Sequence, residues 1–238
     1  SIEGDLVSRP YVEITRRMVE DFGGKIEVTP KGFWWQGGGN YTARAYDIEP
    51  DASSASYAFA FAAVTGSRIQ VPGLAPGALQ GDYGFVDLLE RMGARVERAA
   101  GATTVQGGAP LTAIDADMFH ISDTVMTLAA IAPLVPGTTS IRNVANIRIK
   151  ETDRLAATVA ELRRLGQEVS EGPDFLRIEP RRVTPAIVHS YKDHRMAMSF
   201  AILGAVQAGV SIEDPACVAK TYPGFWLDLA ANYPTSPW

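Results

Sequence analysis

The sequence predicts an α+β fold built from a repeated unit of about 70 residues. The first observation is a series of aspartates, 72 and 70 residues apart, that each precede an apolar segment: Asp51, Asp123 and Asp193. The second is a series of glycines, 70 and 73 residues apart, that each end an amphipathic segment: Gly23, Gly93 and Gly166. Because both series have nearly the same period, we interpret them as one supersecondary unit used repeatedly.

The unit opens with a helix that we expect to be buried. The predicted helices are residues 51–66, 123–134 and 193–206, and their side chains are apolar or small nearly all round. A surface helix would keep a polar face, and the aspartate before each segment is a suitable N-cap. A solenoid of stacked repeats is the alternative. Helices this apolar favour a closed domain in which the three pack together with their N-termini pointing the same way.

The rest of the unit is a strand, an amphipathic helix and two further strands. The predicted amphipathic helices are residues 11–22, 85–92 and 155–165, each ending near a glycine. Strands are expected after the buried helices, at residues 68–71, 139–142 and 210–213, and after the amphipathic helices, at residues 25–28, 95–97 and 168–170. The last of these forms a hairpin with residues 175–178.

The repeats also predict a division of the chain. Residues 49–238 hold two units and most of a third, whereas residues 1–40 supply only the back half of a unit. The period breaks in the glycine-rich stretch that starts at Gly37 and ends at Pro50. We therefore predict two parts, residues 1–48 and 49–238. Either the chain is a piece of a longer parent or its first unit is degenerate.

Composition limits the possible functions. With 46% apolar and 21% charged residues in 238, the chain is expected to fold as a soluble globular protein with a sizeable core. A net charge of −5 argues against a general nucleic-acid or anionic-membrane binder. Cys217 is the only cysteine, which excludes an intrachain disulfide and a thiolate zinc cluster. The chain has neither an apolar run of ~20 residues nor an evident signal peptide, so reducing cytosol is the expected compartment.

Basic side chains stand where helices are predicted to begin, although lysine and arginine are locally unfavourable there. They lie in three segments: 150–154, 193–195 and 220–223. One such residue is normally a solvated side chain. Three at equivalent points of a repeat would meet on one surface, where free amides and guanidinium groups bind anions. The sequence thus predicts a face for phosphate or carboxylate groups. No metal site is expected, because the histidines have no matching carboxylate spacing.

Six segments resemble the 5-enolpyruvylshikimate-3-phosphate synthase family. They follow in order along nearly the whole chain: 4–11 (GDLVSRPY), 51–57 (DASSASY), 80–82 (QGD), 142–155 (RNVANIRIKETDRL), 193–198 (DHRMAM) and 220–223 (KTYP). The enolpyruvyl transferase of peptidoglycan synthesis shares the fold but lacks the second and fifth strings. The resemblance implies two domains, each a three-fold pseudo-symmetric set of such units, with buried-helix N-termini facing the cleft between them.

The resemblance also implies an activity. The family transfers the carboxyvinyl group of phosphoenolpyruvate to the 5-hydroxyl of shikimate 3-phosphate, releases phosphate, and uses neither metal nor organic cofactor. Residues 1–48 resemble the end of the shikimate-side domain, and 49–238 most of the phosphoenolpyruvate-side domain. The front part of the family enzyme, close to half, is absent. The chain is therefore expected to supply one wall of the site and to be inactive or weakly active alone. It is expected to need a complementary front half, or to be a non-catalytic phosphoenolpyruvate- or phosphate-binding fragment.

Residue roles are carried over by motif. Asp123 would accept the hydroxyl proton and Glu151 would protonate the methylene carbon. The phosphoenolpyruvate ligands would be Arg154, Arg195 and Lys220, with His194 beside them. The shikimate 3-phosphate ligands would be Asn146 and Lys150 at the ring, and Ser8 and Tyr11 at the phosphate side. Glu151 stands between two cations, so charge alone makes it anionic, and its acid role needs burial or bound anions.

Some positions depart from the family pattern, and some aromatic residues have no assigned role. Phe119 stands where the family often has Asn, Ser122 where it often has Pro, and Pro50 where Gly is usual. These changes alter the loops before Asp123 and Asp51 but remove no named catalytic side chain. The four tryptophans are expected to pack rather than to bind a ligand: Trp34, Trp35, Trp226 and Trp238.

Overall fold

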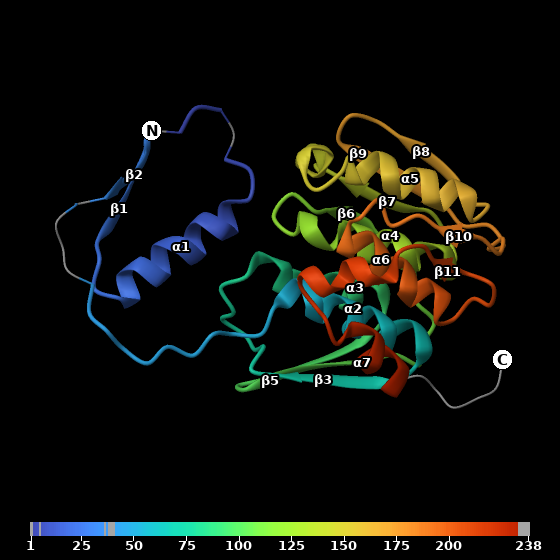
Figure 1. Ribbon diagram of the computed structural model, residues 1–238, viewed down its shortest axis with the longest axis horizontal. Helices are drawn as coiled ribbons and strands as arrows, with labels where there is room; N and C mark the ends of the chain where they lie inside the picture. The colour runs from blue at the N-terminus through green and yellow to red at the C-terminus, as the bar shows by residue number, and fades with distance from the viewer. Residues whose placement is uncertain (1, 5, 36, 38–40, 233–238) are drawn as a thin grey trace.

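The predicted order of elements recurs along the second part of the chain. The computed structural model describes residues 2–4, 6–35, 37 and 41–232, and Figure 1 shows their arrangement. The first unit consists of α2 (Ala52–Thr65), β3 (Arg68–Pro72), α3 (Phe85–Met92), β4 (Arg95–Ala99) and β5 (Ala102–Gln106). The second consists of β6 (Asp115–Asp117), α4 (Val125–Ile131), β7 (Thr139–Arg142), α5 (Arg154–Arg164), β8 (Glu168–Glu171) and β9 (Phe175–Glu179). The third consists of β10 (Ile187–Val188), α6 (His194–Gly204), β11 (Ser211–Ile212) and α7 (Phe225–Ala231).

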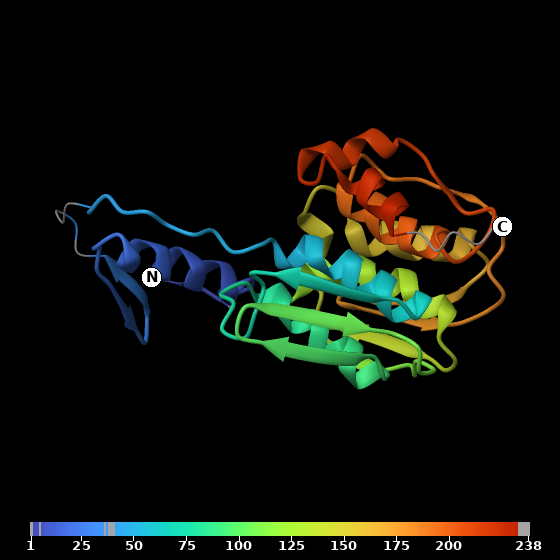
Figure 2. The same ribbon diagram turned by 90° about the horizontal axis from the view of Figure 1, so that it is seen from below.

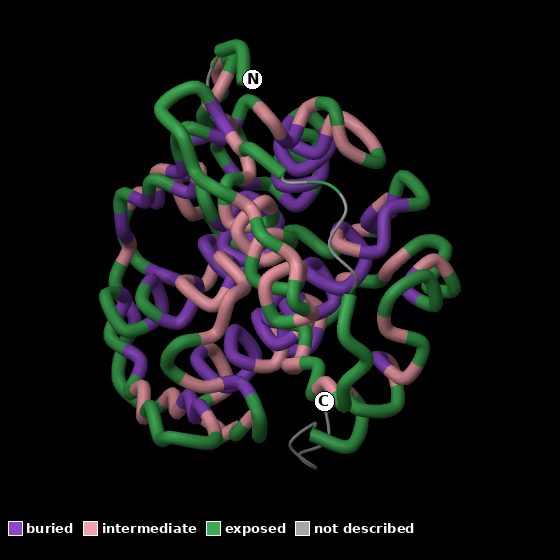
Figure 3. The backbone as a smooth tube through the Cα atoms, turned by 90° about the vertical axis from the view of Figure 1, so that its left-hand side faces the viewer, coloured by how far each residue is buried: buried purple, intermediate pink, exposed green. Residues whose placement is uncertain are grey.

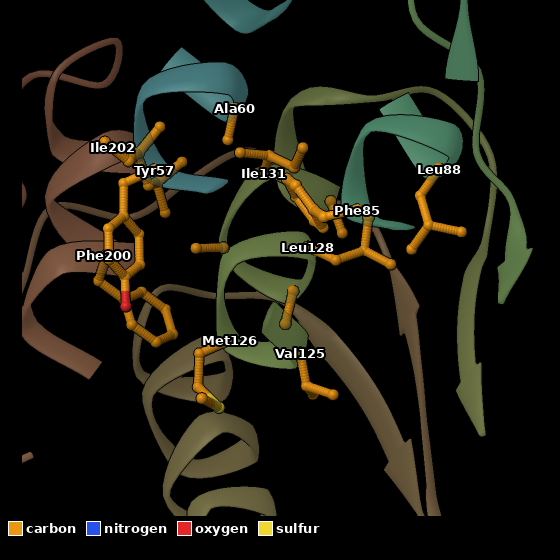
Figure 4. Packing of buried hydrophobic residues seen from close by; sticks show 14 of the residues in the cluster. Tyr57, Ala60, Phe85, Leu88, Val125, Met126, Leu128, Ile131, Phe200 and Ile202 are labelled. Carbon is orange, nitrogen blue, oxygen red and sulfur yellow. The ribbon is translucent and has the colours of Figure 1, made fainter. Parts of the chain in front are cut away.

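The three apolar helices α2, α4 and α6 pack against one another in the core, as Figure 4 shows. All seven residues of α4 are buried, because this helix has no polar face to turn toward water. A line of hydroxyl groups joins the helices: Ser56 on α2 lies 3.1 Å from Thr127 on α4, which lies 3.3 Å from Ser199 on α6. One shared core is the closed arrangement that the sequence favoured over a solenoid. The three-fold symmetry of whole units stays a prediction.

The sheets cover the outside of these helices. Figure 2 shows the β3–β5 sheet below α2; its strand order is β3-β5-β4, and all its pairs are antiparallel. The second sheet has the order β6-β7-β9-β8, with β6 parallel to β7 and the other pairs antiparallel. The parallel pair β10-β11 completes the third unit among the described residues.

The amphipathic helices lie where the sequence placed them. On α5 the predicted apolar stripe, Leu155, Val159 and Leu162, is buried. Both α3 and α5 end just before a glycine with positive φ, 112° at Gly93 and 82° at Gly166. That conformation lets the chain reverse into the following strand at little steric cost. The sequence therefore predicted the type and the limits of these helices correctly.

The end of the chain differs from the expectation. The last helix was predicted to begin within residues 220–223, but α7 begins at Phe225 with Gly224 as its N-cap. Lys220 is instead the last residue of a 3₁₀ helix, η5 (Pro215–Lys220). The physical reason is Pro223, which disfavours helical backbone in the residue before it and so separates the two helices. No helix in the described part of the chain is long and apolar enough to cross a membrane.

The described residues before position 49 stand at one side of the molecule. They form α1 (Arg9–Asp21) and a hairpin of β1 (Ile26–Thr29) and β2 (Gly32–Trp35), and an extended segment joins them to α2 (Figures 1 and 2). Apart from Gly32, no described residue of this part is buried, and Figure 3 shows it in green and pink. The side chains of Trp34 and Trp35 are 61% and 59% exposed.

The packing role expected for the tryptophans is not seen for Trp34 and Trp35, whose side chains stay exposed within the described chain. It is right for Trp226, which packs against the core and donates its indole N–H to the Pro215 carbonyl at 2.8 Å. Trp238 lies outside the described residues.

Candidate active site

The N-terminal ends of the three buried helices meet at one place. Asp51 caps α2 by accepting the Ser53 N–H at 2.9 Å, and Asp193 caps α6 by accepting the Arg195 N–H at 2.9 Å. The cap predicted for Asp123 is wrong. This residue lies inside a 3₁₀ turn, η2 (Ser122–Thr124), and makes no cap bond, because its carboxylate oxygens are engaged by cations instead.

Arg154 is the centre of the charge network. Its side chain is 1% exposed, yet it carries a full charge and so requires partners. The guanidinium group donates to Asp193 at 2.7 Å through Nε and at 3.2 Å through Nη2. It also lies 3.0 Å from Asp123 and 2.6 Å from Glu151. The planar, five-donor geometry of arginine suits a position between three carboxylates.

Three more cations join this network from other elements. Arg195 on α6 donates to Asp123 at 3.1 Å, and Lys150, just before α5, lies 3.6 Å from the same carboxylate. Lys220, at the end of η5, lies 2.9 Å from Glu151. The predicted cations of segments 150–154, 193–195 and 220–223 therefore gather at one site. Lys220 reaches it from the end of a 3₁₀ helix rather than from a helix start.

Residues 1–48 contribute a hydroxyl group to the same place. The Tyr11 hydroxyl donates to Oδ2 of Asp123 at 2.9 Å, across 112 residues of sequence. Burial and the charges of Asp82 and Asp123 raise the pKa of Tyr11, so it stays a neutral donor. Ser8 is the N-cap of α1, with a left-handed backbone (φ 57°), and its carbonyl accepts the Tyr11 N–H at 3.0 Å. Its hydroxyl makes no cap bond.

Two further predicted residues lie beside the network with unpaired buried atoms. Asn146 donates to the Ser122 hydroxyl at 2.9 Å, next to Asp123, while its carbonyl oxygen has no hydrogen-bond partner among the described residues. His194 is 3% exposed, and its Nδ1 has no hydrogen-bond partner in the same part of the chain, although it lies 3.7 Å from an Asp193 carboxylate oxygen. Burial and the adjacent Arg195 lower the pKa of His194, which keeps the imidazole neutral at pH 7. Unsatisfied buried polar atoms are rare in folded proteins, so these two atoms mark the region beside the network as a candidate binding site.

The two candidate proton-transfer groups are both anionic in the free chain. Burial alone would raise the pKa of Asp123, but the charges of Arg195, Lys150 and Arg154 outweigh it and lower the pKa. Burial acts in the same upward sense on Glu151, where the Lys220 hydrogen bond and Arg154 outweigh it and bring the pKa to about 2. Asp123 can therefore accept a proton. Glu151 can donate one only after Lys220 and Arg154 have paired with another anion.

Asp82 is a functional candidate that the sequence reasoning missed. It lies in the 3₁₀ turn η1 (Gly81–Gly84), is 5% exposed, and accepts a hydrogen bond from the Ser53 hydroxyl at the start of α2. Burial raises the pKa of Asp82 to about 6, and its charge in turn acts on Tyr11 and Arg195. Its only signal in the sequence is membership of the string QGD. Within the described chain, no group of three or more His, Cys, Asp or Glu is arranged to hold a metal ion.

Comparison with known proteins identifies the family of this chain. The family model described as EPSP synthase (3-phosphoshikimate 1-carboxyvinyltransferase) matches residues 1–229. A 3-phosphoshikimate 1-carboxyvinyltransferase of Nostoc punctiforme is 49% identical over 226 residues, which cover 94% of this chain and 53% of the relative. One of Escherichia coli is 45% identical over 232 residues, which cover 96% of this chain and 54% of the relative.

Solved structures show the same fold. An EPSP synthase from Acinetobacter baumannii superposes with a TM-score of 0.80 at 26% identity, over 92% of this chain and 54% of that one. The enolpyruvyl transferase NikO from Streptomyces tendae, at 20% identity, shares the fold with a TM-score of 0.69. The chain spans about half the length of the curated relatives it matches. Within that span, the family match from residue 1 to 229 shows that this chain belongs to the EPSP synthase (3-phosphoshikimate 1-carboxyvinyltransferase) family.

Proposed function

We propose that this chain supplies the phosphoenolpyruvate-binding wall of a site that transfers the carboxyvinyl group of phosphoenolpyruvate to the 5-hydroxyl of shikimate 3-phosphate and releases phosphate. One observation carries the proposal: four cations, Lys150, Arg154, Arg195 and Lys220, are joined around two carboxylates, Asp123 and Glu151. Phosphoenolpyruvate carries a phosphate and a carboxylate, so fixed cations in a partly dry site would bind it strongly. Arg154, Arg195 and Lys220 are the proposed ligands, with neutral His194 beside them.

Asp123 is the proposed general base. Its three cationic neighbours keep it ionised, and its Oδ2 already accepts a hydrogen bond from the Tyr11 hydroxyl at 2.9 Å. A carboxylate in this state can take the proton of the attacking 5-hydroxyl as the new C–O bond forms. Tyr11, Ser8, Asn146 and Lys150 are the proposed contacts to shikimate 3-phosphate. Of these, only Tyr11 and Lys150 contact Asp123 directly.

Glu151 is the proposed acid, and the ion pairs explain how ligand binding would activate it. In the free chain Lys220 and Arg154 hold its pKa at about 2. A phosphate group that takes these two cations removes the interactions that favour the carboxylate, so its pKa rises. A protonated Glu151 could then deliver its proton to the methylene carbon while the hydroxyl adds to the neighbouring carbon. The two carboxyl groups would thus act in opposite protonation states.

The second wall of the site is proposed to come from a complementary front half. We assign residues 1–48 to the remnant of the shikimate-side domain and 49–238 to the phosphoenolpyruvate side. Apolar side chains on α1 and its hairpin lie open to solvent, which is typical of a surface made for a partner: Met18, Val28, Trp34 and Trp35. Because catalysis by positioning needs both walls, the chain alone is expected to be inactive or weakly active.

Phosphate release from phosphoenolpyruvate plus shikimate 3-phosphate tests this function. The chain is assayed alone and after addition of the front half of the Nostoc punctiforme relative. We expect turnover only in the mixture, abolished by Asp123→Asn and retained by Asp87→Asn, whose side chain is 65% exposed and pairs with Arg98. Turnover by the chain alone would contradict the two-wall account. Phosphoenolpyruvate binding without turnover in any mixture would favour the second candidate, a non-catalytic binding fragment.

A further inference from the structure

A backbone turn in a disfavoured conformation leads directly into the anion-binding end of α6. Tyr191 and Lys192 have φ values of 56° and 58°, the left-handed region. They are the only two consecutive non-glycine residues with positive φ in the described chain. Side chains with a Cβ rarely adopt this conformation, and it persists only where neighbouring contacts enforce it. The next residue is Asp193, which caps α6 and holds Arg154.

Glu161 on α5 supplies those contacts. Its side chain is fully buried, at 0% exposure, and lies outside the charge network. It accepts the His189 N–H at 3.0 Å and the Tyr191 hydroxyl at 2.7 Å. Among the residues that the structure describes, its one cationic partner is Arg164, at 3.0 Å, whose own side chain is 42% exposed. A buried carboxylate is costly unless it is fully hydrogen-bonded. The hydrogen bonds from His189 and Tyr191 therefore stabilise both the Glu161 carboxylate and the turn at residues 189–192.

The same helix holds the loop at a second point. Arg154, at the first residue of α5, bonds Asp193, while Glu161, about two helical turns further along, bonds residues 189 and 191. Figure 1 shows α5 (yellow) near the chain that runs through β10 into α6. Two contacts from one rigid helix fix both the position and the direction of the segment. That segment then presents His194 and Arg195 to the site.

We propose that Glu161 is a positioning residue of the anion site, acting through Tyr191 to hold the left-handed turn that aims His194 and Arg195. This inference rests on the proposed function, because the groups it positions are the proposed phosphoenolpyruvate ligands. The hydrogen bonds of Glu161 go to residues 189 and 191 and not to these ligands, so its substitution would remove no ligand side chain. What would change is the alignment of α6 relative to Arg154.

The test compares Tyr191→Phe and Glu161→Gln with the wild type. Tyr83→Phe is the matched control, because the Tyr83 hydroxyl also makes one half-buried hydrogen bond, at 2.8 Å to Thr103, away from this loop. Binding of phosphoenolpyruvate is measured by calorimetry, and the Arg195 amide, which donates to the cap Asp193, is followed in the ¹H–¹⁵N spectrum of the free chain. We expect Tyr191→Phe and Glu161→Gln to weaken binding at least fivefold and to shift the Arg195 amide, with neither effect in Tyr83→Phe.

The readouts separate a positioning role from a purely structural one. A lower melting temperature with wild-type affinity and an unmoved Arg195 amide would overturn the proposal. If Glu161→Gln does not fold, Tyr191→Phe still decides, since it removes a single hydroxyl. If the wild type binds no phosphoenolpyruvate, the proposed function fails, and the Arg195 amide in the free variants still decides whether Glu161 positions α6.

Discussion

Replacement of Arg154 by methionine should destabilise the fold far more than the loss of an ordinary ion pair. Met keeps much of the side-chain volume but leaves Asp193 and Asp123, at 0% and 8% exposure, without their shared cation. Leaving one partner of a buried pair uncompensated costs about 3–5 kcal/mol. A chain of this size loses roughly 2–4 °C in melting temperature per kcal/mol. We therefore expect Arg154→Met to melt about 6–20 °C below the wild type.

The matched control is Arg163→Met on the same helix. Arg163 is 51% exposed and pairs with Glu171 at 3.2 Å, so its loss should cost less than about 1 kcal/mol. Both variants are compared with the wild type by urea unfolding and by thermal melting. Equal, small losses for Arg154→Met and Arg163→Met would refute the view that Arg154 is the buried centre of the site.

The pH dependence gives the same prediction a second test. In the wild type, neighbouring cations lower the pKa of Asp123, so its contribution to stability is present above its unfolded pKa and is lost as pH falls through the folded pKa. In Arg154→Met one of those cations is gone, so the folded pKa of Asp123 rises. Arg195 and Lys150 still lower that pKa in the variant, so both proteins lose this stabilisation only at acid pH. The difference in unfolding free energy between variant and wild type should therefore narrow only as pH falls below about 4, and a difference that stays constant there would contradict the electrostatic explanation.

Two further substitutions test Asp82 and the contact between the two parts of the chain. Burial raises the pKa of Asp82 from 3.8 to about 6, so the wild type loses stability as pH rises between these two values. Measured by urea unfolding, the stability of Asp82→Asn relative to wild type should therefore increase by about 2 kcal/mol from pH 4 to pH 7. A difference that does not change with pH would refute this. A Cβ on Gly81 would lie 2.6 Å from the His120 carbonyl and 2.7 Å from Pro10, whereas one on Gly101 meets nothing within 4 Å. Gly81→Ala should therefore lose about 1–3 kcal/mol of unfolding free energy, and Gly101→Ala almost none. Similar losses in the two variants would contradict the close contact of Gly81 with Pro10 and His120.

The order of elements was predictable because it depends on local patterns. Apolar segments without a polar face identified α2, α4 and α6, and glycine after an apolar stripe identified α3 and α5. Two short strands, β6 with three residues and β10 with two, gave no such signal. The equally short β11 lies within the predicted strand 210–213. β6 and β10 are strands only because a partner strand lies beside them, and that partner is set by the tertiary fold.

The sequence predicted the site residues that recur at equivalent positions of the repeat. It did not predict those whose role depends on a single contact between residues far apart in the chain. Lys150, Arg154 and Arg195 stand near starts of α5 and α6, so their convergence followed from the repeat. An aspartate before an apolar segment predicts a cap equally well at positions 51, 123 and 193. Only the cations placed around Asp123 by the fold make it different. Asp82 depends on Ser53, which lies 29 residues away, and neither has a local signature.

The most direct measurement is a calorimetric titration of this chain with phosphoenolpyruvate alone. The central claim is that cations from separate units form one site for a multiply charged anion, so Arg195→Met should lose at least tenfold in affinity. Arg163→Met, which removes an exposed arginine outside the network, should bind as the wild type does. Affinity should fall as salt is raised, because the attraction is electrostatic. Equal affinity in Arg195→Met and Arg163→Met, or no binding by the wild type, would contradict the account.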